Sequence, residues 1–106
     1  MRCLVVTKQT IPMPPEMVLG LFAAMKAWSA RYIASGKLEQ VWSFAGLNGG
    51  GGIFNVGSLE ELDQIMKEFP FGPFADSKIY GLVDLDTSLD TASKAFEAMM
   101  GATAAH

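Results

Sequence analysis

The order of the apolar patterns along the chain is the feature that most restricts its fold. Residues 1–8 alternate loosely between apolar and polar and carry β-branched side chains, which predicts a strand. From residue 16 to about residue 35, apolar residues recur at spacings of three and four, which predicts an amphipathic helix. Its apolar stripe consists of Val18, Leu21, Met25, Trp28 and Tyr32. Gly36 follows, where a left-handed helix cap is expected.

The same succession of patterns returns in the second half of the chain. Residues 38–46 and 52–56 predict two further strands. Ser58 and Glu61 then form a capping box that begins a second helix. The face of this helix that is predicted to be buried carries Leu59, Leu62, Ile65, Met66 and Phe69.

A proline-containing segment that cannot continue a helix leads to the last two elements, a fourth strand over residues 77–85 and a third helix over residues 87–100. The resulting order, β-α-β-β-α-β with a terminal helix, is the ferredoxin-like split βαβ arrangement. We therefore expect one α+β domain over residues 1–100 with a four-stranded antiparallel sheet. Residues 101–106 are expected to form a flexible tail.

The predicted sheet has helices on one face only. If each strand alternates strictly, its open face carries the apolar residues Leu4, Val6, Trp42, Phe44, Ile53 and Leu82. Monomeric proteins rarely expose an apolar patch of this size to solvent. We therefore expect two sheets to meet face to face in a homodimeric α+β barrel. Assembly of such dimers into a higher oligomer is an alternative that the sequence does not decide.

Composition and charge narrow the classes of partner. The net charge is −3 and the basic residues are scattered, which argues against nucleic acid as a partner. No apolar run reaches the roughly 18 residues that a bilayer-spanning helix needs, and no leader pattern is present, so we expect a cytoplasmic protein without a membrane partner. Cys3 is expected to be a buried thiol. The one histidine, His106, is the last residue and acids are not clustered, so no metal site is expected.

Four consecutive glycines, residues 49–52, raise the question of a phosphate-binding loop. Such a loop needs a helix N-terminus directly after it, whereas a strand-like segment follows here without a Lys-Ser/Thr pair. The run lies between two predicted strands, where glycine supplies the positive φ angles of a hairpin. We predict a turn, and a flexible lid at a pocket mouth is the minor alternative.

Several stretches of the middle of the chain resemble the muconolactone isomerase family. The resemblance covers roughly residues 20–90 without a gap and is carried most specifically by WSFAG at residues 42–46 and FPFGPF at residues 69–74, with AxxKAWSARYIASG and LVDLDTSL in support. It implies the ferredoxin-like dimeric barrel and a role in aromatic catabolism. The implied reaction moves a proton between carbons of an unsaturated lactone without a cofactor.

The polar residues of that family are kept only in part. Lys26 keeps its position, while the acids around it are replaced by Ala24, Met25 and Ala27. Lys26 would bind a substrate carboxylate or act as a base, and a solvated helix lysine is an equal alternative. No other general base can be assigned from the sequence.

Tyr80 and Asn55 are the candidates for stabilising enolate charge beside Lys26. Tyr80 brings a hydroxyl to an otherwise apolar wall. Asparagine is uncommon inside a strand, so Asn55 either satisfies a local backbone group or faces a cavity. The candidate substrate contacts are Trp42, Gln40, Glu39, Arg31, Phe44 and Phe74. A structural ion pair for Arg31, solvent exposure for Glu39 and dimer core for Trp42 are the competing interpretations.

Two functional hypotheses follow. The first is a cofactor-independent isomerase, or a related proton-transfer enzyme, acting on a small unsaturated lactone or cyclic ketone in a barrel pocket. The second is a non-catalytic or accessory protein that binds a small molecule of a biosynthetic or catabolic pathway in the same cavity. A purely structural oligomer, the third possibility, predicts a solid interior without a cavity.

Overall fold

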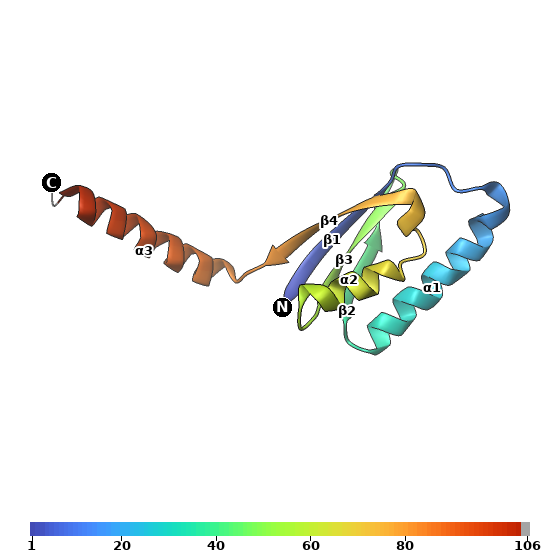
Figure 1. The fold of residues 1–106 in the computed structure, drawn as a ribbon, viewed down its shortest axis with the longest axis horizontal. Coiled ribbons are helices and arrows are strands. Elements are labelled where there is room, and N and C mark those ends of the chain that lie inside the picture. The colour runs from blue at the N-terminus through green and yellow to red at the C-terminus, as the bar shows by residue number, and fades with distance from the viewer. Residues whose placement is uncertain (105–106) are drawn as a thin grey trace.

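The computed structural model describes residues 1–104, which form a four-stranded antiparallel sheet with helices on one face and a third helix that projects away from it (Figure 1). The elements are β1 (Arg2–Gln9), a 3₁₀ turn (Pro15–Met17), α1 (Val18–Ala34), β2 (Leu38–Ser43), β3 (Gly49–Asn55), α2 (Leu59–Lys67), a 3₁₀ turn (Gly72–Phe74), β4 (Ala75–Leu82) and α3 (Leu85–Ala104). The strand order in the sheet is β2-β3-β1-β4. The predicted β-α-β-β-α-β layout is confirmed.

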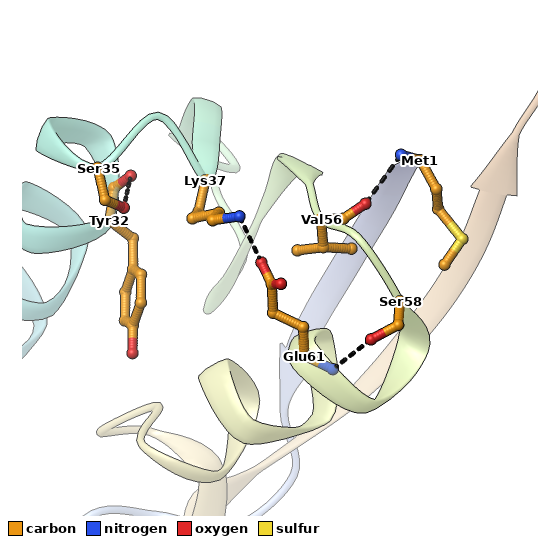
Figure 2. Close-up of polar contacts among 7 residues, drawn as sticks. All are labelled: Met1, Tyr32, Ser35, Lys37, Val56, Ser58 and Glu61. Carbon is orange, nitrogen blue, oxygen red and sulfur yellow. Dashed lines mark hydrogen bonds and ion pairs between the residues drawn. The ribbon is translucent and has the colours of Figure 1, made fainter.

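The helix boundaries follow from local chemistry. Gly36, which follows the C-cap residue Ser35 of α1, has φ +77°, a conformation that costs glycine little. The Ser58 hydroxyl accepts a 3.1 Å hydrogen bond from the Glu61 N–H and caps α2, as the capping box predicts. Close by, the Glu61 carboxylate forms a 2.8 Å ion pair with Lys37, and the Met1 ammonium donates a hydrogen bond to the Val56 carbonyl (Figure 2). These contacts hold together one end of the fold.

The core lies between the sheet and the helices α1 and α2. Trp28 occupies its centre, with its ring 5.1 Å from Phe69, 5.6 Å from Tyr32 and 6.0 Å from Phe54, measured between centroids. Its indole N–H donates to the Ile65 carbonyl at 3.2 Å, so the buried ring has a partner for its polar atom. Cys3 is a free and fully buried thiol, as expected.

The glycine run is not the turn that the sequence suggested. β3 begins at Gly49, and the hairpin turn lies before it, over residues 45–48, where Gly46 has φ +75°. A Cβ on Gly49 would collide with the Thr7 carbonyl oxygen, and one on Gly50 with the Trp42 carbonyl oxygen. Glycine is required here because neighbouring strands approach closely, whereas only the turn itself needs a positive φ.

The open face of the sheet carries the residues expected there. Leu4 pairs with Ile53 on one side and with Tyr80 on the other, so these three side chains share a face. Trp42 pairs with Gly51 on the same face. Phe44 lies one residue beyond the end of β2. No part of residues 1–104 covers this face, since both α1 and α2 lie on the other side (Figure 1).

α3 is longer than predicted. It starts at Leu85 and runs through Ala104, which includes the first four residues of the segment expected to be a tail; residues 105–106 lie outside the described residues. The Asp84 carboxylate accepts from the Thr87 N–H at 3.0 Å and from its hydroxyl at 3.1 Å, and so caps the start of α3. Within residues 1–104, none of the helices combines the length and the apolar character that crossing a membrane requires.

Candidate active site

A cavity of about 500 Å³ lies between the sheet and α1. β1 contributes Val5, Thr7 and Gln9 to its wall, because every second residue of a strand faces the same way. The four glycines at the start of β3 form a floor without side chains. The cavity therefore exists largely because this part of the sheet carries no side chains to fill it.

Aromatic rings close the side of the cavity opposite the floor. Phe22 of α1 meets Phe71 edge-on, with centroids 6.2 Å apart, and Phe71 meets Phe69 at 5.8 Å. Phe74, one of the predicted substrate contacts, also lines the cavity. The FPFGPF motif thus supplies most of the aromatic wall, and its two prolines hold the rings in an irregular segment.

Lys26 is the one cation among the described lining residues. None of the ion pairs within the described part of the chain involves Lys26, whereas Lys37 and Lys67 each pair with a carboxylate. The lining contains no Asp, Glu or His side chain among the described residues. A charge without a counter-ion beside an apolar wall is suited to binding an anionic group.

The other polar groups of the cavity were not identified from the sequence. Thr7 is 9% exposed, and its hydroxyl is 2.9 Å from that of Ser77 on β4. Gln9 donates to the Ile11 carbonyl at 2.9 Å, and the Asn48 carbonyl accepts from the Gln9 N–H at 2.8 Å. Strict alternation from Cys3 and Val5 would have placed Thr7 and Gln9 on the helix-covered face.

The structure divides the predicted catalytic residues between the two faces of the sheet. Lys26 lines the cavity, whereas Tyr80 pairs with Leu4 on the open face. Asn55 pairs with Arg2, two positions along β1 from Leu4, and is exposed at the end of β3. A single chain does not bring these three side chains together.

The predicted substrate contacts divide in a similar way. Trp42 borders the cavity along with Phe74, although the Trp42 indole packs on Gly51. Gln40 pairs with Ile53 on the open face. Phe44 is half-buried and is not among the lining residues. Glu39 forms a 2.9 Å ion pair with Arg2 and also lies outside the cavity.

Arg31 also lies outside the cavity, in a cluster on the surface. Its guanidinium is 3.2 Å from the Glu68 carboxylate, which also accepts a 2.5 Å hydrogen bond from the Tyr32 hydroxyl. That hydrogen bond, together with burial, raises the pKa of Tyr32 above its ordinary value. Arg31 thus makes the structural ion pair that was the competing interpretation.

The described residues contain no group of three or more His, Cys, Asp or Glu side chains that could hold a metal ion. The chemistry that the cavity itself offers is therefore that of an ammonium, hydroxyls and amides. These groups bind anions and donate or accept hydrogen bonds.

Comparisons with known proteins agree on one family. The family model described as muconolactone delta-isomerase matches residues 1–86. The crystal structure of a muconolactone isomerase at 3.3 Å resolution is 26% identical and superposes with a TM-score of 0.71, covering 79% of this chain and 90% of that one. None of the curated protein sequences matches the chain.

A second solved structure shows the same fold at lower identity. It is a 5-chloro-2-hydroxyhydroquinone dehydrochlorinase from Burkholderia phenoliruptrix AC1100 in complex with 2,5-dihydroxybenzoquinone. It is 16% identical, with a TM-score of 0.66, and the match covers 82% of this chain and 98% of that one.

Proposed function

Because the chain belongs to the muconolactone delta-isomerase family, we propose that it is a cofactor-independent isomerase, or a related proton-transfer enzyme, acting in cytoplasmic aromatic catabolism. Its substrate would be a small unsaturated lactone or cyclic ketone that carries a carboxylate. The observation that carries this proposal is Lys26, a cation without a counter-ion on the wall of an otherwise largely apolar cavity of about 500 Å³.

The shape of the cavity favours a small ring. A planar ring would lie on the side-chain-free floor of β3 and against the Phe22 and Phe71 rings on the other side. The volume is in the range of small-molecule sites. The Lys26 ammonium would hold the carboxylate and so fix which ring carbon faces the polar wall.

Proton transfer between carbons also requires stabilisation of the enolate that forms. Thr7 and Asn48 share the cavity with Lys26 and offer a hydroxyl and an amide where that charge develops. We propose them for this role in place of Tyr80 and Asn55, which lie on the other face of the sheet. Because the Lys26 ammonium holds the carboxylate in this proposal, it does not also take the proton, and the general base is not assigned among the described lining residues.

The open face of the sheet is the surface through which the proposed enzyme would contact a second copy of itself. Trp42, Tyr80 and Leu82 are 37–49% exposed there in a single chain. Two such faces in contact would remove this apolar surface from water, at about 25 cal/mol for each Å². We propose that this contact forms the homodimeric barrel.

One observation favours the alternative of a binding protein without catalysis. The described lining has no carboxylate or imidazole that could move a proton near neutral pH. A lysine that stays protonated would bind an anionic lactone and leave its double bond where it is.

Turnover of muconolactone, followed by ultraviolet absorbance, tests the proposal. We expect activity in the native protein, a loss of at least about 100-fold in Lys26→Ala, and no loss in Lys67→Ala, which removes a surface lysine of α2 that pairs with Asp63 and does not line the cavity. If the native protein is inactive but binds muconolactone in calorimetry, with affinity lost in Lys26→Ala alone, the binding function is correct. If the native protein shows no turnover and no binding of muconolactone, the enzyme and the binding function are both refuted.

A further inference from the structure

α3 has no counterpart to pack against in its own chain. Every described side chain of residues 85–101 is exposed, and the helix points away from the sheet (Figure 1). The radius of gyration is 19.1 Å, whereas a compact chain of this length has about 13 Å. Most helical stability in proteins comes from tertiary packing of an apolar face, and a single copy gives the apolar residues of α3 no such packing. α3 therefore needs a surface that a single copy does not provide.

The spacing of apolar residues on α3 indicates which surface that is. Leu85, Leu89, Ala92 and Phe96 follow one another at intervals of four, three and four residues, the spacing of a coiled-coil seam. Leu85, Leu89 and Phe96 are 55–70% exposed. The flanking positions nearest the middle of the stripe, Ser88, Ser93 and Ala95, are small and uncharged.

We propose that α3 is a self-association arm that pairs antiparallel with α3 of a second copy. In this arrangement Ala92 of each helix lies opposite Phe96 of the other, and a two-fold axis relates the two contacts. Each layer then combines a small and a large side chain, which packs without a void. A parallel pair in register would instead place Phe96 against Phe96 and Ala92 against Ala92. Antiparallel helix dipoles also attract one another.

The area is sufficient for a specific contact. The exposed apolar side chains of two α3 helices would remove roughly 1,000 Å² of apolar surface from water, and interfaces between identical chains are about 65% apolar. The whole contact would then bury about 1,500 Å², within the range of stable protein–protein interfaces. Both helices present the same stripe, so the contact closes on itself as a dimer.

This pairing is separate from the catalytic proposal. The family match ends at residue 86, so almost all of α3 lies outside it. Contact through α3 also uses a different surface from contact through the open face of the sheet. A protein that uses both would assemble beyond a dimer.

Cysteine cross-linking of the full chain tests the pairing directly. Ser93 flanks the seam next to the two-fold axis, so Ser93→Cys should give covalent dimers with a short bis-maleimide in dilute protein. Lys94→Cys, on the outer side of the same turn, should not, and Cys3 is fully buried and does not compete. Cross-linking of Ala92→Cys in preference to Ser93→Cys would mean parallel pairing and overturn the proposal.

Light scattering of a second variant covers the remaining outcomes. Phe96→Ser should weaken α3-dependent association at least tenfold, as the loss of a central aromatic anchor does, while circular dichroism shows the sheet intact. Lys94→Ser should leave the mass unchanged. An unchanged mass in Phe96→Ser would refute α3 pairing.

Discussion

The Trp42 indole lies on Gly51 of the neighbouring strand, with its Cε2, Cζ2 and Nε1 atoms 3.0 Å from the position that a Cβ would occupy. Gly51→Ala should therefore displace the indole by a few tenths of an ångström and lower the free energy of unfolding by about 1 kcal/mol. Gly20→Ala is the control, because its Cβ would meet open space on α1 and a helical alanine adds up to about 1 kcal/mol. Urea denaturation measures both, and equal stability of the two variants would contradict the contact.

Leu62 and Leu59 lie three residues apart on α2, one fully buried and the other 57% exposed. Leu62→Ala should cost about 2–5 kcal/mol of unfolding free energy, because it leaves a cavity beneath the helix. Leu59→Ala should change it by less than about 0.5 kcal/mol. Thermal or chemical denaturation distinguishes the two, and a reversed order would mean that α2 presents another face to the sheet.

The Tyr32 hydroxyl and the Glu68 carboxylate give the protein an alkaline-sensitive contact. Tyr32→Phe should lower stability by about 1 kcal/mol near pH 8. The pKa of Tyr32 is raised above 10.0 in the folded protein, so its contribution is complete below pH 10 and is lost as the pH rises through the folded value. The difference between native protein and Tyr32→Phe in urea denaturation should therefore shrink above pH 10. A difference that stays constant would contradict this assignment.

The Lys37–Glu61 ion pair behaves in the opposite sense. The hydrogen bond from Lys37 holds the pKa of Glu61 below 4.5, so the stabilisation is present above that pH and is lost as the pH falls through the folded value. Glu61→Gln should lower Tm at pH 7, and the gap to the native protein should close towards pH 3. Glu60→Gln, next to it on α2 but outside the described ion pairs, should show no such closing gap. A Tm gap in Glu61→Gln that persists to pH 3 would contradict the assignment.

The fold was predictable because its signals are local. The stripe through Trp28 and Tyr32, the Gly36 cap and the Ser58 capping box each depend on neighbours within a few residues. The glycine run was misinterpreted because the reason for it is not local. Gly49 and Gly50 are constrained by carbonyl oxygens of Thr7 and Trp42 on adjacent strands, and that approach follows from the tertiary structure.

The site was predictable only in part, for a related reason. Lys26 and Phe74 were found from a motif and do line the cavity. Tyr80 was grouped with Lys26 by chemical type, and the strand register places it on the opposite face. Alternation along β1 indicates the face of Thr7, but a hydroxyl in a strand does not by itself indicate that a cavity lies in front of it. Which polar groups converge depends on pairing between strands far apart in the sequence.

The bare floor of β3 also constrains how this protein can evolve. Substitutions at Gly49 and Gly50 are excluded by the backbone, so that side of the cavity keeps the same shape in any functional descendant. New substrate preferences would therefore arise through the lining residues that carry side chains, such as those of β1, α1 and the aromatic segment after α2. One wall therefore acts as a fixed reference plane, and selection changes the molecule that fits above it by adjusting the other wall.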